Sequence, residues 1–346
     1  MEILHVTRPV AVSDLQEVPF PSVDAAAPLG VLTRCPVAAQ TPLVSAPMLA
    51  DRAGVADVHV KDERNRMGLG SFKALGAAYV IAHDAQQGRA QGRTYVTASA
   101  GNHGLSVAAG AAAFGAKAVV FIAETVPESF AARLAAQGAQ VVREGAFYEA
   151  SMAAAQQAAD QNGWQLLSDS SWPGYMAIPH RLMEGYLAMM DEVIRQMPAP
   201  PSHIFLQAGV GGLAGACAAL ARQAWGDAPR IIVVEPVVAA ALHGSIAAGA
   251  PVQSGGPASQ MGRLDCKMPS LIALKGLARD ADCYALISEA EGAEGAGQAE
   301  AAGLRSTPSG AAGIAALLAL TDPDKAALGI TAASVVLCIL SEEAEG

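Results

Sequence analysis

Two kinds of hydrophobic pattern alternate along the chain from about residue 55. One is a short apolar run rich in β-branched residues, which is typical of a strand buried in a parallel sheet. The other is a longer Ala-rich stretch with apolar residues at helical spacing. The strand-like runs are DVHVK, RTYVTA, AVVFIA, QVVRE, QLLS, HIFLQA, RIIVVEP and SVVLCIL. Their alternation with helices predicts an α/β protein with mostly parallel sheets and helices on both faces.

The Ala-rich stretches predict the helices between these strands. They include SFKALGAAYVIAHDAQQ, HGLSVAAGAAAFG, SFAARLAAQG and MAIPHRLMEGYLAMMDEVIRQ. The third ends at Gly138, and glycine is common directly after a helix. The acidic, Gly- and Ala-rich residues 288–306 predict a solvated surface helix with turns. Residues 1–40 hold several prolines and no clear period, so we expect them to wrap a neighbouring lobe or contribute to an interface.

Composition narrows the class of protein. The chain has 346 residues, of which 52% are hydrophobic and 16% charged, and no apolar run is long enough to cross a bilayer. We therefore expect a well-buried protein of two lobes that does not enter a membrane. The net charge of -10 disfavours nucleic acid as a partner, because phosphates would be repelled.

The pattern of cysteines and the first residues of the chain indicate in which cell compartment we expect the protein. The five cysteines are scattered without CxxC spacing, which predicts neither a zinc site nor a disulfide framework. We also see no other cluster of ligands for a metal. The start MEILHVTRPVAV lacks a basic segment followed by an apolar core, so we expect no secretory signal and a cytoplasmic location.

Lys73 is the first residue with candidate chemistry. It lies in GLGSFKALGAAY (residues 68–79), where a Gly-x-Gly-Ser turn precedes an apolar helical run. A lysine at the start of a helix is commonly exposed and has no special role. A desolvated amine, in contrast, has a lowered pKa, attacks carbonyl groups and forms a Schiff base. This stretch alone leaves both interpretations open.

Asn102 lies in a turn of small residues, TASAGNHGLSVAAG (residues 97–110). Small residues on both sides of Asn102 and His103 suit a tight strand-to-helix turn whose backbone approaches a ligand closely. The amide of Asn102 would then meet an oxygen of a flat ligand. The alternative is an ordinary polar turn in which His103 caps or stacks.

A glycine cluster follows a later strand, in QAGVGGLAGACAAL (residues 207–220). A strand that runs into glycines and then a helix directs backbone N–H groups at an anion, as a phosphate cradle does. An acidic ribose partner in the register of a dinucleotide site is missing, and so is the GK[ST] of a Walker sequence. Close helix packing without a ligand is the alternative.

Asp169 ends a predicted strand in LLSDSSWPGYMAIPHRLMEGYLAMMDEV (residues 166–193). The serines, Trp172 and the Pro-Gly turn that follow it suit a carboxylate that faces a cleft. The alternative is that Asp169 is the N-cap of the next segment, which is a common use of aspartate.

In this order, the Schiff-base lysine, the Gly-Asn-His turn and the glycine cradle resemble the β-family (fold type II) of pyridoxal-phosphate (PLP) enzymes. That family includes threonine and serine dehydratases, cysteine synthase and threonine synthase. The resemblance runs from TPLVSAPML (residues 41–49) to the C-terminus. Within the family the chain is most similar to diaminopropionate ammonia-lyases, in KDERNRMGLGSFKALGAAY, in SDSSWPGYMAIPHRLMEGYLAMMDE and in QMGRLDCKMPS. In the last segment Arg263 interrupts a pattern of small residues.

The resemblance implies roles for individual residues. Lys73 would hold PLP as a Schiff base and act as a catalytic base, and Asp169 would lie near the amine of the substrate. The other cofactor contacts would be Phe72 near the ring, Asn102 on the phenolic oxygen, Ser341 on the pyridine nitrogen, and the amides of Gly209, Val210, Gly211, Gly212 and Leu213 on the phosphate. Ser309 in STPSGAAG is a second candidate hydroxyl near the cofactor, and Ser341 could instead be a strand-end hydroxyl in a frayed tail.

The resemblance also implies an architecture like that of the tryptophan synthase β-subunit. We expect a large PLP-binding lobe of residues 1–91 and 164–346 and a small mobile lobe of residues 92–163. The cofactor would lie between the lobes, at the carboxyl ends of the strands. Family members are commonly homodimers, so we expect a homodimer whose interface includes part of the N-terminal segment.

The activity implied is PLP-dependent β-elimination from a small amino acid, with L-2,3-diaminopropionate converted to pyruvate and ammonia. The alternative on the same scaffold is a dehydratase for L-serine, L-threonine or 3-hydroxyaspartate. Ala100 stands where diaminopropionate ammonia-lyases carry an aspartate proposed to serve the D-isomer, so we expect little activity on D-substrates. Two other classes are a dinucleotide-dependent oxidoreductase, which the missing ribose partner disfavours, and a PLP-binding protein without catalysis, for which Ala100 is the one argument.

Overall fold

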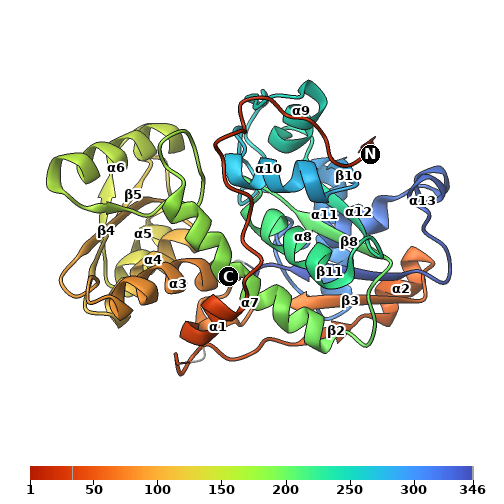
Figure 1. Ribbon diagram of the computed structural model, residues 1–346, viewed down its shortest axis with the longest axis horizontal. Helices are drawn as coiled ribbons and strands as arrows, with labels where there is room; N and C mark the ends of the chain where they lie inside the picture. The colour runs from red at the N-terminus through yellow and green to blue at the C-terminus, as the bar shows by residue number, and fades with distance from the viewer. Residues whose placement is uncertain (33, 345–346) are drawn as a thin grey trace.

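The protein folds around two β-sheets of unequal size, which form the two lobes in Figure 1. The computed structural model describes residues 1–32 and 34–344. The large sheet has the strand order β1 (Glu2–His5), β10 (Cys283–Ile287), β9 (Arg230–Pro236), β8 (His203–Gln207), β11 (Val335–Leu340), β3 (Asp57–Asp62), β2 (Leu43–Ser45). The small sheet has the order β6 (Ala139–Arg143), β5 (Lys117–Ile122), β4 (Thr94–Ala98), β7 (Gln165–Leu166).

Strand pairing confirms the expected α/β class. The four strands of the small sheet are parallel, and so are the five inner strands of the large sheet. Only the edge strands β1 and β2 run antiparallel to their neighbours. All eight strand-like runs form strands. The sequence analysis did not name β1, β2 or β10. Strands β1 and β2 have four and three residues, too few to show a period, whereas CYALI of β10 has the composition of a buried strand.

Helices cover the small sheet and link it to the large one. The small lobe holds α4 (Asn102–Ala113), α5 (Glu128–Ala136) and α6 (Tyr148–Asn162). Helix α3 (Lys73–Gln86) lies beside α4, and α7 (Ala177–Gln196) runs between the lobes (Figure 1). The large lobe holds α1 (Ala26–Leu32), α2 (Pro47–Ala53), η1 (Arg66–Gly68), α8 (Gly212–Trp225), α9 (Ala241–Ala248), α10 (Leu271–Asp280), α11 (Glu289–Ala301), α12 (Ala312–Ala319) and α13 (Asp322–Leu328). In the part of the chain that the structure describes, no helix combines the length and the apolarity needed to span a bilayer.

The two sheets do not by themselves define domain units. Strand β7 lies beyond the expected boundary at residue 163, but it belongs to the small sheet, since Gln165 pairs with Tyr95 of β4. Helix α3, which we assigned to the large lobe, packs against both α4 and α7. One buried cluster includes side chains from both lobes, among them Ile81, Leu105 and Met183. The division into lobes at residues 92 and 163 therefore stays a prediction.

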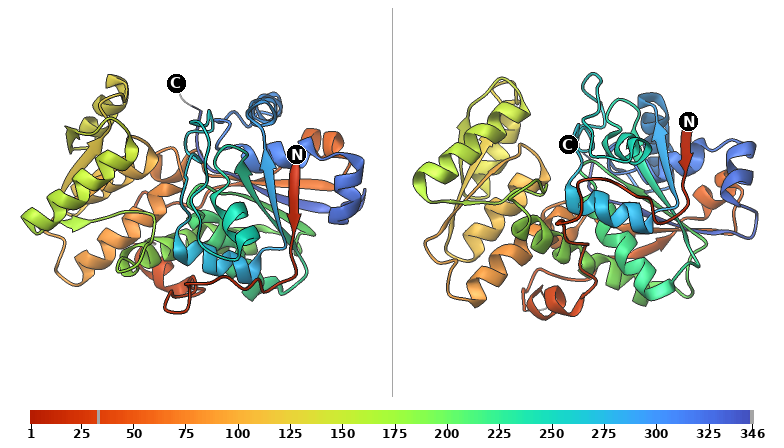
Figure 2. Two further views of the ribbon diagram at one scale, coloured as in Figure 1. Left: turned by 90° about the horizontal axis from the view of Figure 1, so that it is seen from above. Right: turned by 45° about the horizontal axis from the view of Figure 1, so that its top comes forward.

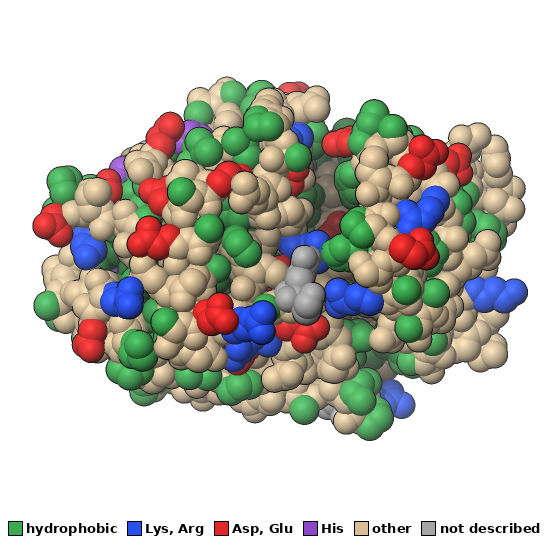
Figure 3. Space-filling view, turned by 180° about the vertical axis from the view of Figure 1, so that it is seen from behind, with side chains coloured by type: hydrophobic (Ala, Val, Ile, Leu, Met, Phe, Trp, Pro, Cys, Tyr) green, Lys and Arg blue, Asp and Glu red, His purple; other side chains and the backbone are tan. Residues whose placement is uncertain are grey.

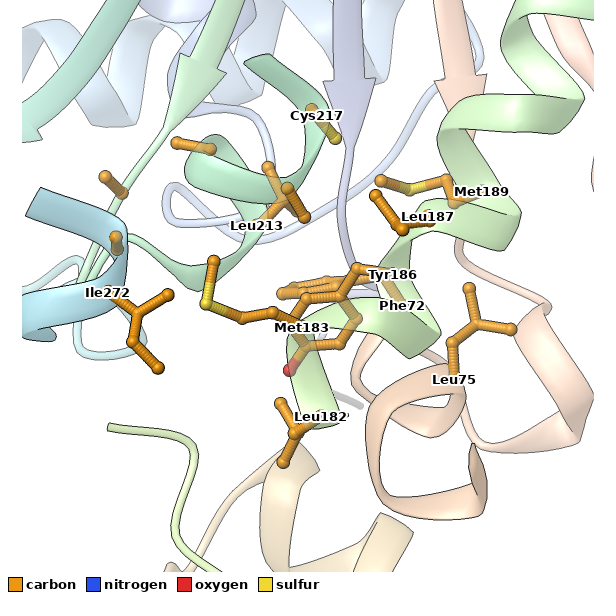
Figure 4. Close-up of a cluster of buried hydrophobic side chains, with 14 of the residues drawn as sticks. Phe72, Leu75, Leu182, Met183, Tyr186, Leu187, Met189, Leu213, Cys217 and Ile272 are labelled. Carbon is orange, nitrogen blue, oxygen red and sulfur yellow. The ribbon is translucent and has the colours of Figure 1, made fainter. Parts of the chain in front are cut away.

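The junction of the lobes is a tightly packed core around α7. Figure 4 shows Phe72 beside Tyr186, with Met183 of α7 near Leu213 of α8. The ring centres of Phe72 and Tyr186 are 4.9 Å apart in an edge-to-face arrangement, which is favourable for aromatic pairs. A Cβ on Gly185 would lie 2.5 Å from the carbonyl oxygen of Leu75. The missing side chain at this position thus lets α7 approach α3.

The segment at residues 288–306 forms a helix, as expected, but it is not solvated all round. Helix α11 begins at a capping box, in which Ser288 and Glu291 exchange hydrogen bonds. Gly292 and Gly295 are buried, and a Cβ on Gly295 would lie 2.3 Å from the Cβ of Ala315 in α12. Two of the glycines that suggested turns therefore lie at packing contacts instead, Gly295 against α12 and Gly292 against Met261.

The N-terminal segment wraps the large lobe, as expected. Strand β1 extends the large sheet, and the chain then crosses α10 (Figures 1 and 2). The backbone N–H of Val10 donates to the carbonyl of Ala278, and Lys275 donates to the carbonyls of Leu15 and Val18. Its expected part in a subunit interface stays a prediction.

Candidate active site

The C-terminal end of the chain lies against the lysine segment. Lys73 is the first residue of α3, and the backbone N–H of Phe72 donates to the carbonyl of Ser341 at 3.1 Å. Ser71 and Glu342 form an antiparallel bridge beside it. Ser341 is buried at the end of β11, so it is not part of a frayed tail. The structure thus brings Ser341 against the Phe72–Lys73 segment, from which it is far apart in sequence.

Lys73 is paired with Asp169. Its Nζ donates a hydrogen bond of 2.5 Å to Oδ2 of Asp169, which follows β7, and both side chains are mostly shielded from solvent. Helix α7 begins only at Ala177 with Met176 as its N-cap, so Asp169 is not the cap of that helix. Of the two interpretations of Asp169, the structure favours the carboxylate that faces the lysine.

The pair corrects our expectation of a lowered lysine pKa. Burial opposes the charge of Lys73, but the carboxylate of Asp169 outweighs this effect and raises the pKa of Lys73. Burial likewise opposes the charge of Asp169, and the Lys73 ammonium lowers the pKa of that carboxyl. In the protein alone, the two groups therefore form a shielded ion pair.

Two further side chains face Lys73 that the sequence analysis missed. Burial raises the pKa of the Tyr186 hydroxyl, and the positive charge of nearby Lys73 opposes this rise. Burial also raises the pKa of the Cys266 thiol to about 12, and Asp169 adds to this rise. Both residues lie in segments quoted for the family resemblance, but neither is at a position where the spacing alone indicates chemistry.

The glycine cluster connects β8 to α8 and has the features of an anion cradle. Gly211 is the N-cap of α8 with φ of 95°, a left-handed conformation that favours glycine. A Cβ on Gly209 would lie 3.0 Å from Sγ of Cys266 and 3.1 Å from the carbonyl oxygen of Arg263. Helix α8 has neither a side-chain cap nor an acidic residue in its first turn, so its N-terminus offers N–H groups and a positive dipole.

Asn102 begins α4 and is held by a carboxylate that the sequence analysis missed. Its Nδ2 donates to Oε2 of Glu342 at 2.5 Å, and the hydroxyl of Thr307 also donates to Glu342. Glu342 is 4% exposed, and Nε of Arg263 lies 3.7 Å from its Oε2. Glu342 directly follows Ser341 at the end of a predicted strand, and this position is the feature of the sequence that could have identified it.

Two other residues of the predicted site have structural partners. His103 is buried, and its Nε2 donates to the carbonyl of Leu167 at 2.8 Å. Burial lowers the pKa of His103, so its ring is neutral near pH 7. The hydroxyl of Ser309 accepts a 3.2 Å hydrogen bond from the backbone N–H of Arg263 and so supports the loop beside the cradle.

A family model described as pyridoxal-phosphate dependent enzyme matches residues 35–342. The chain belongs to this family. It is 32% identical to diaminopropionate ammonia-lyase from Escherichia coli K12 over 251 residues, which is 66% of this chain and 63% of that protein. It is 30% identical to mouse L-serine dehydratase/L-threonine deaminase over 212 residues, 61% of each chain. The alignments thus span less than two thirds of the length of these curated relatives.

Comparison of structures gives the same family. The crystal structure of diaminopropionate ammonia-lyase from Escherichia coli in complex with an aminoacrylate–PLP azomethine reaction intermediate matches with a TM-score of 0.88 and 27% identity. The match covers 99% of this chain and 93% of that chain. The fold is therefore that of fold type II PLP enzymes, and the cofactor is PLP.

The residues present fit this cofactor. The amine of Lys73, which is mostly shielded from solvent, is the nucleophile that can bond to the aldehyde carbon of PLP. The cradle at residues 209–213 leads into the N-terminus of α8, which has no side-chain cap and no acidic residue in its first turn and so suits a phosphate. The individual contacts of Phe72, Asn102 and Ser341 with PLP stay predictions.

Proposed function

We propose that this protein is a PLP-dependent lyase that eliminates the β-substituent of an L-amino acid, with L-2,3-diaminopropionate as its best substrate and pyruvate and ammonia as products. The observation that carries the proposal is the buried Lys73–Asp169 pair, which lies in a chain similar to diaminopropionate ammonia-lyases. Asp169 places a carboxylate beside the amine, which supports a role for Lys73 as a group that takes up and holds a proton.

The roles of the side chains follow from their positions. PLP, when bound, withdraws electrons from the α-carbon of an amino acid. Once Lys73 is released from its covalent link, its amine takes the proton of the α-carbon. Asp169 orients this amine and stabilises its protonated form. Gly209 to Leu213 hold the phosphate through backbone N–H groups, and closure of the small lobe excludes water from the reaction.

Selectivity for L-substrates is part of the proposal. Ala100 has no group that can take a proton, whereas Lys73 and Asp169 both carry one. We expect little or no turnover of D-2,3-diaminopropionate. Comparable turnover of both enantiomers would contradict this point and leave the elimination chemistry standing.

A dehydratase for L-serine, L-threonine or 3-hydroxyaspartate is the second candidate. The similarity to the mouse L-serine dehydratase/L-threonine deaminase supports it, as does the Ser-Ala-Gly-Asn-His turn at residues 99–103. The two candidates share their catalytic groups and differ in the leaving group, which is an amine in one and a hydroxyl in the other.

The test is a substrate profile of the purified protein loaded with PLP. Both enantiomers of 2,3-diaminopropionate, L-serine, L-threonine and 3-hydroxyaspartate are supplied separately, and ammonia and 2-oxo acid are measured. Fastest turnover of the L-diamine supports the lyase, and fastest turnover of a hydroxy amino acid makes the protein a dehydratase. A Lys73→Ala variant that kept the visible absorbance band of the cofactor would overturn the assigned anchor.

We further propose a cytoplasmic homodimer. Phe20, Val37 and Met48 expose apolar side chains, and we expect the subunit contact to bury part of this area. Sedimentation equilibrium of the holoenzyme measures the oligomeric state, and a monomer at micromolar concentration would refute the dimer.

A further inference from the structure

Asp169 lies where the chain passes from the small sheet to the large lobe. On its N-terminal side, the backbone N–H of Leu167 donates to the carbonyl of Val96 in β4 at 2.8 Å. On its C-terminal side, the carbonyl of Ser171 accepts a 3.2 Å hydrogen bond from the backbone N–H of Leu271 in α10. Asp169 is therefore held between two anchors, one in each lobe.

The second anchor is a buried pair of hydroxyls, from Ser171 and Ser270. Their Oγ atoms are 2.7 Å apart, and the two residues are 2% and 0% exposed. The backbone N–H of Ser171 also donates to Oγ of Ser270 at 3.2 Å. Oγ of Ser171 accepts from the backbone N–H of Ile272 at 3.0 Å. Ser171 thus caps the first turn of α10 from a segment that is distant in sequence.

The same pair reaches the phosphate cradle. The backbone N–H of Ser270 donates to the carbonyl of Val210 at 2.9 Å. Helix α10 also packs on the cradle, since a Cβ on Gly211 would lie 3.0 Å from the Cβ of Ala273. A continuous set of hydrogen bonds therefore leads from the segment of Asp169 through two hydroxyls to Val210.

The ion pair with Lys73 cannot hold Asp169 throughout a reaction. A lysine nitrogen that is bonded to a carbonyl carbon is no longer the free ammonium that Asp169 holds in the protein alone. The lobes also do not press together everywhere, because the face in Figure 3 is hollowed between them. In that state the position of Asp169 depends on its own segment, which the two serines fix to the large lobe.

We propose that Ser171 and Ser270 are positioning residues, which hold the carboxylate of Asp169 at the Lys73 amine and in a fixed relation to the phosphate cradle. A buried hydroxyl that loses its partner is costly, so each serine keeps the other in place. Both act through Asp169. The inference rests on the proposed function only where it concerns elimination, because the contact of Asp169 with Lys73 is present without a substrate.

The test measures the reactivity of Lys73 in the full-length, cofactor-free protein. Only the neutral amine reacts with an amine-selective reagent, so the rate of modification, followed by mass spectrometry, reports how strongly Asp169 stabilises the ammonium. Ser171→Ala loosens the hold on Asp169. We expect the rate at about pH 9 to rise at least about threefold, which corresponds to a fall of about half a unit in the pKa of the amine. Ser270→Ala should give a similar rise.

The Asp169→Asn background separates positioning from better access of the reagent. If Ser171 acts through the Asp169 charge, Ser171→Ala adds no further rise in this background. A site that is merely more open would raise the rate in both backgrounds. The two serines should also be coupled, so that the double variant exceeds the larger single effect by less than about twofold.

Ser245→Ala is the matched control. Ser245 is fully buried like Ser270, but its hydroxyl donates to the carbonyl of Ala241 within α9. Loss of this hydroxyl should leave the rate at Lys73 unchanged. Because Ser171 and Ser270 test the same pair, a single variant that fails to fold leaves the other to decide.

Kinetics of the holoenzyme distinguish this inference from the proposed function. With the best substrate found, Ser171→Ala should lower kcat roughly tenfold and change KM less than about threefold, since a small displacement of a catalytic group is costly. A wild-type rate at Lys73 in both serine variants, a rise in the Asp169→Asn background or an unchanged kcat would each overturn the inference. If wild type eliminates from no substrate while the lysine results hold, the proposed function fails and the inference stands.

Discussion

The amine nitrogen of Lys73 lies 2.5 Å from a carboxylate oxygen of Asp169, although 96 positions separate the two residues in sequence. Lys73 begins the helix that leaves the large sheet, and Asp169 follows the last strand of the small sheet. The pair therefore connects the two lobes. A change in lobe position would alter this contact directly, which ties the state of the lysine to the arrangement of the lobes.

Removal of the Asp169 charge should lower the pKa of Lys73 in the cofactor-free protein. The Asp169→Asn variant keeps the size of the side chain, and burial of the amine then acts without a compensating carboxylate. The rate of Lys73 modification by an amine-selective reagent, followed by mass spectrometry against pH, should rise at lower pH than in wild type. We also expect elimination activity to fall by roughly 10²- to 10⁴-fold. An unchanged modification profile would contradict the ion pair.

A side chain at Gly211 should weaken cofactor binding. Gly211→Ala places a Cβ at a φ of 95° and within 3.0 Å of Ala273 and Leu242, so the N-terminus of α8 must shift. We expect the dissociation constant for PLP to rise at least tenfold. Gly163→Ala is the matched control, because Gly163 is also left-handed but open and far from the cradle in sequence. Equal PLP affinity in both variants would argue against the cradle.

Loss of the Glu342 charge should lower stability and activity more than loss of the charge of its neighbour Glu343. Glu342→Gln removes the buried negative charge beside Arg263 and loosens the contact with Asn102, so both stability and activity should fall. Breaking a buried charged contact costs about 2–5 kcal/mol in the free energy of unfolding. Glu343→Gln, at an exposed side chain 4.0 Å from Arg133, should change it by less than about 1 kcal/mol. Urea unfolding of both variants measures the difference.

Glu235 should make stability depend on pH. It lies at the end of β9, where it accepts hydrogen bonds from the backbone N–H groups of Leu242 and His243. Burial raises the pKa of Glu235 to about 8, above its ordinary 4.5, although these hydrogen bonds oppose the rise. The folded protein thus binds the proton more tightly than the unfolded chain, and this contribution is lost as pH rises from about 4.5 through 8. The melting temperature should fall over this window less in Glu235→Gln than in wild type; parallel curves would refute the assignment.

The buried ion pairs that Glu192 forms with Lys61 and Arg66 should hold in place the loop that precedes Lys73. Glu192 of α7 pairs with Lys61 and Arg66, and all three are almost fully shielded from solvent. Glu192→Ala removes the carboxylate that Lys61 pairs with and leaves Arg66 with Glu63 alone, so we expect a loss of about 3–5 kcal/mol in the free energy of unfolding. Asp191→Ala is the control on the same helix, where the partner Arg195 is exposed, and should cost less than about 1 kcal/mol. Similar midpoints in denaturant for both variants would contradict a stabilising cluster.

The α/β class, most strands and part of the candidate site could be predicted from the sequence alone. Alternating apolar runs and helical stretches identified the α/β class, because strands buried on both sheet faces are short continuous apolar runs that differ from the helical spacing between them. The cradle at Gly209–Leu213 was visible because a left-handed N-cap at Gly211 favours glycine. Glu342 and Tyr186 were missed, since a single Glu or Tyr has no pattern until its partners are in place.

By itself the sequence determined the strands β3 to β9 and β11 and the main helices between them, and it singled out Lys73, the glycine cluster at residues 209–213 and the turn at Asn102. Only the tertiary structure decided that Asp169 reaches Lys73, that Glu342 holds Asn102 and that Arg263 covers Gly101. The physical reason is that periodicity reports local burial, whereas these contacts join segments through the packing of two sheets. The sign of the Lys73 pKa shift depended on the same packing, because burial alone would have lowered it.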